Sequence, residues 1–170
     1  ACAPSRRYPE PMYAAAARAL AARGWQVVLL GGAGEERASA ERIARAARAP
    51  LFSLAGETSF AELVAAIALA PLLVANNSGP AHVAAAVGTP VVDLYALTNP
   101  QHTPWQVPSR VLAHDVPCRG CAKSVCPESH HLCLRGIHPQ QVVDAVESLW
   151  TETAPPISTH RRAPQSPLLA

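Results

Sequence analysis

The sequence has little of what marks a nucleic-acid-binding or membrane-spanning protein. Its 170 residues carry a formal net charge of only +2 and no basic run, so nothing indicates a nucleic-acid partner. No apolar stretch approaches the roughly 20 residues that span a bilayer, and no signal-peptide pattern opens the chain. With 49% hydrophobic and 15% charged residues, the composition indicates a globular domain with a sizeable core. The chain starts with Ala rather than Met, and residues 1–5 read like the interior of a domain, so we expect a fragment of a longer protein.

Strand and helix patterns alternate along the first 95 residues. The predicted strands are short, apolar and rich in branched residues, as buried parallel strands are: 25–30, 50–54, 72–75 and 90–95. The predicted helices are 11–23, 35–47, 59–69 and 80–87, with Thr58 or Ser59 capping the third and Glu62 at capping-box distance from Ser59. The alternation predicts an α/β fold with a parallel sheet and right-handed crossovers.

The pattern changes after Tyr95. Residues 96–117 are interrupted by prolines and read as a loop, and a cysteine-rich insert occupies 118–133. An amphipathic helix follows at 139–150. Residues 151–170 contain several prolines and show no periodicity, so we expect a disordered tail. The predicted organisation is one domain over 1–150 and a tail over 151–170.

The stretch 72–88 joins an apolar strand to an alanine-rich helix through a polar turn. Asn77, Ser78 and Gly79 form the turn, Pro80 suits the first turn of the helix, and His82 follows within that turn. A helix N-terminus offers unpaired N–H groups and the positive end of a dipole, which suits phosphate, and Gly79 lets a ligand approach the backbone. An ordinary connection with Ser78 as a helix cap fits the same residues.

Other loops are expected to join this turn. In a parallel α/β sheet, ligands bind at the carboxyl ends of the strands. The sequence therefore predicts that the loops 31–36, 55–59, 76–82 and 95–104 open on one edge.

Several groups of residues together resemble a known family. Residues 6–10 read Arg-Arg-Tyr-Pro-Glu, Gly31-Gly32 is followed by Glu35, and residues 76–82 read Asn-Asn-Ser-Gly-Pro-Ala-His. With the ending Cys126-Pro, Cys133-Leu and Ile137-His-Pro-Gln-Gln, this order resembles the C-terminal half of family 9 glycosyltransferases, the ADP-heptose:lipopolysaccharide heptosyltransferases, in their heptosyltransferase II-like variant. The resemblance implies the Rossmann-like C-terminal domain of a GT-B fold, in which two such domains face each other across a cleft.

The resemblance also implies which residues contact a nucleotide sugar. Cys2 and Arg6 would lie near the diphosphate, with Arg6 in place of the usual Lys. Glu35, or Glu36 beside it, would accept hydrogen bonds from the ribose, and Thr58 would contact the base. From the residues alone, Arg6 also fits a solvated basic loop, Glu35 a favourable charge at a helix N-terminus, and Thr58 a helix cap.

Asn77 departs from the family pattern, which normally has Asp in an Asp-Ser/Thr-Gly sequence reaching the donor sugar and phosphates. Asn keeps the hydrogen-bonding geometry but cannot act as a base, so the resemblance implies donor positioning without catalysis by this residue. Ser78, Gly79 and His82 keep the pattern, and His82 would stabilise the leaving diphosphate. A buried helix histidine bonded to a backbone carbonyl is the alternative for His82.

The implied reaction is inverting transfer of heptose from ADP-heptose to the lipopolysaccharide inner core, with no cofactor required for catalysis. The general base and the lipid A–core acceptor surface would belong to an N-terminal domain outside this chain, so we expect no catalytic residue and no turnover here. Such an enzyme would be cytoplasmic, at the inner face of the inner membrane. A GT-B enzyme using a UDP-sugar and a non-catalytic nucleotide-binding or interaction module remain as alternatives.

Four cysteines lie within a span of 16 residues, with His130 between the last two: Cys118, Cys121, Cys126 and Cys133. Four soft ligands at this spacing would hold a structural zinc ion. Disulfides and free thiols are the alternatives.

Overall fold

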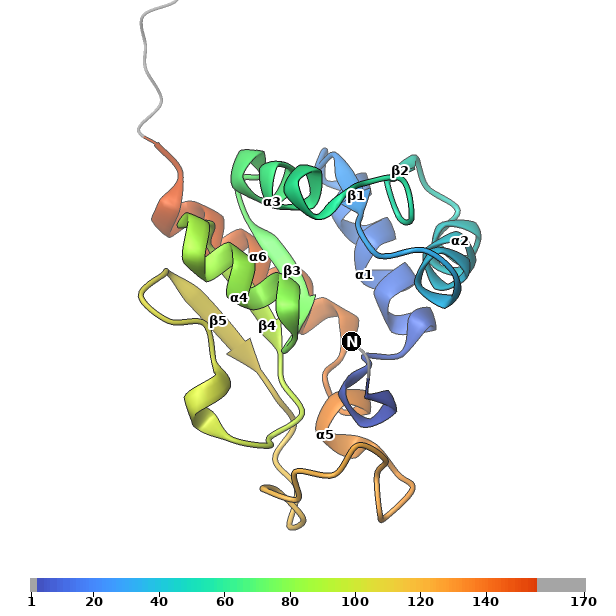
Figure 1. Ribbon diagram of the computed structural model, residues 1–170, viewed down its shortest axis with the longest axis vertical. Coiled ribbons are helices and arrows are strands. Elements are labelled where there is room, and N and C mark those ends of the chain that lie inside the picture. Colours follow the sequence, from blue (N-terminus) through green and yellow to red (C-terminus); the bar gives the residue numbers. More distant parts are fainter. Residues whose placement is uncertain (1–2, 156–170) are drawn as a thin grey trace, which may run out of the picture.

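The computed structural model describes residues 3–155 and follows the predicted alternation (Figure 1). In chain order its elements are η1 Pro4–Arg6, α1 Glu10–Ala22, β1 Val27–Leu29, α2 Glu35–Ala47, β2 Leu51–Ser53, α3 Phe60–Leu69, β3 Leu73–Asn76, α4 Gly79–Val87, β4 Val91–Leu94, η2 Pro100–His102, β5 Ser109–Leu112, α5 Leu132–Arg135 and α6 Pro139–Thr153. Every helix and strand predicted before residue 95 is present, with bounds that differ by at most two residues.

All strands pair in parallel, but in two groups rather than the single sheet we expected. β1 pairs with β2, with Val27 opposite Leu51, and β3, β4 and β5 form a separate ladder in that order. Strand β4 lies at the centre of the larger group, and all four of its residues are buried.

The expectation of a loop over 96–117 is wrong at residues 109–112, which form β5 and pair with β4. The segment Ser-Arg-Val-Leu is short and begins directly after Pro108, so it carries little strand signal of its own. Pairing with β4 supplies that signal, and the Arg110 guanidinium also reaches Ser148 and Glu152 on α6.

Helices cover both faces of the larger group. Val92 packs with Leu20 of α1 and with Val143 and Val146 of α6. Val91, whose side chain points to the opposite face, packs with Ile67 of α3 and with Ala81 and Ala84 of α4. The parallel strands are therefore buried between two helical layers, as their continuous apolar sequence predicts.

Helix α6 runs three residues beyond its predicted end, so the expectation of disorder is wrong for residues 151–153. Trp150, at the predicted end, packs edge to face on Trp25 with ring centroids 5.6 Å apart, and Glu152 in the added turn accepts a hydrogen bond from Arg110. The rest of the expected tail, from residue 156 onward, lies outside the described residues.

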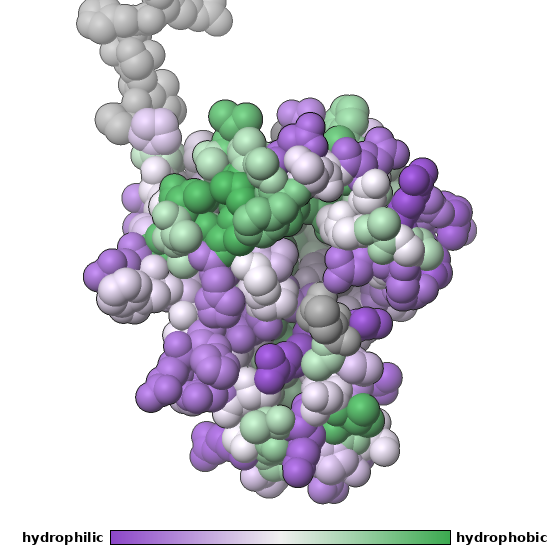
Figure 2. Space-filling model, viewed as in Figure 1, coloured by the Kyte–Doolittle hydropathy of each residue, from purple (hydrophilic) through white to green (hydrophobic). Residues whose placement is uncertain are grey.

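The largest apolar area in Figure 2 lies over α3 and α4. Phe60 and Leu69 at the two ends of α3 are 71% and 86% exposed, whereas Ile67 on the same helix is buried against Ala75 and Val91 of the sheet. Within residues 3–155, no helix combines the length and apolar character needed to cross a membrane.

Candidate functional site

The turn between β3 and α4 has an open helix N-terminus. Ser78 occupies the N-cap position, but its side chain makes no capping bond and its hydroxyl instead donates to the Asn76 carbonyl at 3.1 Å. A Cβ added at Gly79 would meet nothing within 4 Å, so the protein's own packing does not require glycine there. The side-chain cap that would compete with an anion is therefore missing from this helix.

His82 lies in the first turn of α4 with an exposed side chain, and within residues 3–155 that side chain makes no hydrogen bond. The alternative of a buried histidine bonded to a carbonyl is therefore wrong. The imidazole remains able to donate to a ligand at the turn.

Asn77 is turned into the protein, with only 4% of its surface exposed. Its side-chain amide donates to the Asp93 carboxylate at 2.9 Å and to the His102 carbonyl. Asn77 thus ties the turn to β4 and to the loop after it. Contact of its side chain with a donor stays a prediction.

Asp93 is the residue of this region that sequence reasoning missed. It is fully buried on β4; one carboxylate oxygen accepts from Asn77 and the other, Oδ1, has no hydrogen-bond partner in the part of the chain described. Burial raises the pKa of Asp93 to about 6, against the opposing effect of the Asn77 hydrogen bond. The available signal was a single carboxylate within the apolar run Val-Val-Asp-Leu.

The opening loop lies beside this turn. The Tyr8 N–H donates to the Asn76 side-chain oxygen at 2.8 Å, which fixes residues 3–9 next to the end of β3. The Nε atom of Arg6 is buried without a hydrogen-bond partner within residues 3–155, so it is a donor that a phosphate could use. Cys2, the other residue predicted on this loop, lies outside the described residues.

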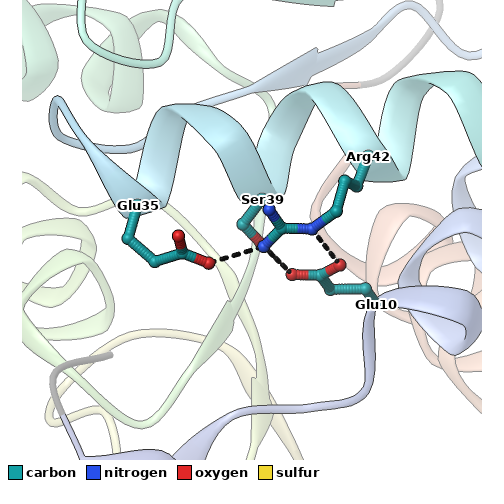
Figure 3. Close-up of polar contacts among 4 residues, drawn as sticks. All are labelled: Glu10, Glu35, Ser39 and Arg42. Atoms are coloured by element: carbon teal, nitrogen blue, oxygen red, sulfur yellow. Dashed lines mark hydrogen bonds and ion pairs between the residues drawn. The ribbon is translucent and has the colours of Figure 1, made fainter.

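Glu35 belongs to an ion-pair network between α1 and α2 (Figure 3). The Arg42 guanidinium contacts Glu35 at 2.6 Å and Glu10 at 2.8 Å, and the Ser39 hydroxyl also donates to Glu10. The hydrogen bond from Arg42 lowers the pKa of Glu10 to about 2. A ribose would therefore meet a Glu35 carboxylate already held by Arg42.

The neighbouring Glu36 bends back onto the strand end. Its carboxylate accepts from the Gly32 N–H at 2.7 Å, and this hydrogen bond lowers its pKa. Two acids are predicted for the ribose. The Glu36 carboxylate is bonded to the backbone of the turn before α2, whereas Glu35 is the first residue of α2.

The structure shows which of Thr58 and Ser59 caps α3. Ser59 caps α3 in a full capping box with Glu62, whose carboxylate accepts from the Ser59 N–H at 2.8 Å. Thr58 is therefore not the helix cap, and the alternative that explained Thr58 as a cap is wrong. The contact of Thr58 with a base stays a prediction.

Backbone and side-chain bonds join the predicted loops in two groups. The Gly56 N–H donates to the Gly31 carbonyl at 2.9 Å, and Asn77 bonds to the His102 carbonyl. Arg7, on the opening loop, contributes to lowering the pKa of both Glu10 and Glu36, which places its charge near the starts of α1 and α2. The loop 31–36 thus meets the loop 55–59, and the loop 76–82 meets the loop 95–104, while the opening of all four loops on one edge stays a prediction.

The four clustered cysteines line one pocket together with His130. All four are free thiols, and Cys118 Sγ lies 3.7 Å from the His130 ring. Within residues 3–155, no three such side chains have the arrangement of a formed metal site, so zinc stays a prediction. The insert is tied to the opening loop, because Ser5 donates through its hydroxyl to the Lys123 carbonyl and through its N–H to the Ser124 carbonyl.

Taken together, the fold and the open turn define an α/β domain with a candidate nucleotide-sugar site at the carboxyl ends of its strands. The family model for glycosyltransferase family 9 (heptosyltransferase) matches residues 1–132, and the chain belongs to this family. It is 35% identical over 153 residues to lipopolysaccharide heptosyltransferase 2 of Salmonella typhimurium, covering 88% of this chain and 44% of that protein.

Two solved structures agree with this assignment. A family 9 glycosyltransferase from Veillonella parvula superimposes with a TM-score of 0.79 at 28% identity, covering 89% of this chain and 44% of that one. The E. coli ADP-heptose lipopolysaccharide heptosyltransferase II gives a TM-score of 0.71 at 32% identity, covering 88% and 43%. The fold is thus that of one domain of a GT-B glycosyltransferase, and the chain spans less than half the length of these relatives.

Proposed function

We propose that this chain is the donor-binding half of an inverting glycosyltransferase that moves heptose from ADP-heptose to the lipopolysaccharide inner core. The observation that carries the proposal is the open β3–α4 turn, with its uncapped helix start, unobstructed Gly79 and exposed His82. Relatives named as heptosyltransferases support the choice of sugar.

Each side chain has a distinct task in this proposal. The α4 N-terminus and Arg6 hold the diphosphate, whose charge grows as the bond to the sugar breaks. His82 donates to the same departing group. Asn77 and Asp93 keep the turn in place from below, while Glu35 and Thr58 contact the nucleoside.

The remaining parts of the reaction belong to a second domain. The general base and the lipid A–core acceptor site would lie there, at the cytoplasmic face of the inner membrane. This chain would therefore bind donor without turning it over.

Titration calorimetry with ADP-heptose, ADP and UDP tests the proposal. We expect both adenine nucleotides to bind and UDP to bind at least about tenfold more weakly. A preference for UDP would favour a UDP-sugar enzyme, and no nucleotide binding at all would favour an interaction module.

A further inference from the structure

Arg42 holds one oxygen of the Glu35 carboxylate and leaves the other open. The two residues lie on the same face of α2, seven positions apart (Figure 3). Helical side chains point back toward the N-terminus, so the Arg42 guanidinium reaches the first turn, where Nη2 donates to Glu35 Oε1 at 2.6 Å. The second oxygen, Oε2, accepts no hydrogen bond within residues 3–155 and is open to a hydroxyl donor.

Arg42 is itself fixed by α1. Its Nε donates to Glu10 Oε2 at 2.9 Å and its Nη2 donates to Glu10 Oε1 at 2.8 Å, a bidentate contact that sets the plane of the guanidinium. The Ser39 hydroxyl, one turn before Arg42, donates to the same Glu10 Oε1 at 2.7 Å. Glu10 is the first residue of α1, which packs against α2. The direction of the Arg42 side chain is therefore set by a second helix.

This arrangement orients side chains more than it stabilises the fold. Hydrogen bonds from Arg42 and Ser39 lower the pKa of Glu10 to about 2, and a guanidinium keeps its charge, so the contacts persist at neutral pH. The Glu35 side chain is 66% exposed, and solvent weakens ion pairs at such positions. An exposed glutamate would otherwise sample several rotamers, and restricting it in advance lowers the entropy lost when a ligand binds.

Glu10 also connects this arrangement to the β3–α4 turn. It follows Tyr8 by two residues, and the Tyr8 N–H donates to the side-chain oxygen of Asn76 at the end of β3. The segment that fixes Arg42 is thus bonded to the strand that leads into the turn. A diphosphate at the start of α4 and a ribose at Glu35 would be held in a spacing that this one segment sets.

We propose that Arg42, fixed by Glu10, is a positioning residue that directs the open oxygen of Glu35 at the ribose hydroxyls and so makes the site selective for ribonucleotides. This inference rests on the proposed function, because Glu35 meets a ribose only when a nucleotide binds at this edge. Arg42 acts through Glu35 and touches no ligand itself. An ion pair that only joined α1 to α2 would not distinguish nucleotides by their ribose hydroxyls.

Titration calorimetry of the full chain with ADP and with 2′,3′-dideoxy-ADP measures this selectivity. The two ligands share the base and the diphosphate, so the ratio of their affinities reports the hydrogen bonds to the ribose. We expect wild type to prefer ADP at least about tenfold and Arg42→Ala to lower this preference at least about threefold. In a Glu35→Ala background the same substitution should leave the ratio unchanged, because Arg42 acts through Glu35.

Three further variants separate positioning from charge and folding. Arg45→Ala removes the same charge from an exposed position of α2 that has no ion-pair partner within residues 3–155, and it should keep the wild-type ratio. Arg42→Lys keeps the charge, but one ammonium group cannot replace the bidentate contact with Glu10 while also holding Glu35, so the preference should still fall. Glu10→Gln should lower the preference as Arg42→Ala does, and it decides the question if circular dichroism shows that Arg42→Ala does not fold.

Equal affinities of wild type for the two ligands would overturn the proposal and leave nucleotide binding standing. The same holds if Arg42→Ala weakens both ligands by one factor. A stronger preference in Arg42→Ala would also overturn it, since Arg42 would then compete with the ribose for Glu35. A fall of the ratio in the Glu35→Ala background would show that Arg42 does not act through Glu35. Binding of neither ligand to wild type would refute the proposed function, and this inference with it.

Discussion

At the scale of single residues, Gly79 marks the point where a ligand is expected to approach the chain. Its φ is not left-handed and a Cβ there would touch nothing, so neither strain nor packing within the protein calls for glycine. A ligand pressed against the start of α4 would account for it.

Replacing Gly79 with Val should separate folding from binding. We expect the free energy of unfolding to change by less than about 1 kcal/mol, because a Cβ at this position meets nothing within 4 Å. The affinity for ADP should fall at least about tenfold by calorimetry, because the added methyl groups would occupy the position that we propose for the diphosphate. As a control, Gly88→Ala places a side chain at φ +82 beyond the far end of α4, where it should cost stability and leave ADP affinity unchanged. ADP binding equal to wild type in Gly79→Val would exclude this turn as the site.

Asp93 should make stability depend on pH. Its pKa rises from 3.8 to about 6 on folding, so between these values the folded state binds more protons than the unfolded state. Stability contributed by this group is therefore present at low pH and is lost as pH rises toward 6.

The substitution Asp93→Asn tests this dependence. The substitution should remove the loss of stability with rising pH. The free energy of unfolding of the variant should therefore rise by about 1–3 kcal/mol relative to wild type between pH 4 and pH 7. Denaturant unfolding of both proteins at each pH measures the difference. A wild-type-minus-variant difference that does not change with pH would show that the carboxyl group is not held protonated.

At the scale of elements, the start of α3 offers a matched pair of hydroxyl side chains. Ser59→Ala removes the capping box and should cost about 0.5–2 kcal/mol of unfolding free energy, with ADP affinity unchanged. Thr58→Ala should leave stability unchanged and weaken ADP binding. The reverse assignment of the two effects would show that Thr58 has no role in binding the base.

The cysteine insert yields a prediction about metal. The four thiols surround one pocket, and we expect about one equivalent of zinc per chain in tag-free protein by elemental analysis. Binding would require the thiols to close in from their present positions, and it would anchor the Ser5 contacts of the opening loop. Less than about a tenth of an equivalent would contradict zinc and leave free thiols.

Elements could be predicted where their signal is local. The capping box at Ser59 and the polar turn after β3 each consist of residues adjacent in sequence. Helices α3 and α4 begin at the positions that these patterns predict. Strand β5 could not be predicted, because four residues after a proline become a strand only through pairing with β4.

At the scale of the whole molecule, the order of the strands could not be predicted from local sequence patterns. Alternating strands and helices predict a parallel α/β fold, yet the interruption between β1 and β3 depends on which distant segments become neighbours. The site shows the same division. Ser78, Gly79 and His82 lie at the turn as predicted, whereas the engagement of Asn77 with Asp93 and of Glu35 with Arg42 arises from contacts remote in sequence.

The most direct test of the β3–α4 turn as the diphosphate site is an amide NMR titration of the whole chain with ADP. We predict that the largest shifts fall on the amides of Ser78, Gly79, Ala81 and His82 and on that of Arg6, with smaller ones near Glu35 and Thr58. Shifts confined to other surfaces, or saturation by ADP without change at residues 78–82, would contradict the assignment of this turn to the donor.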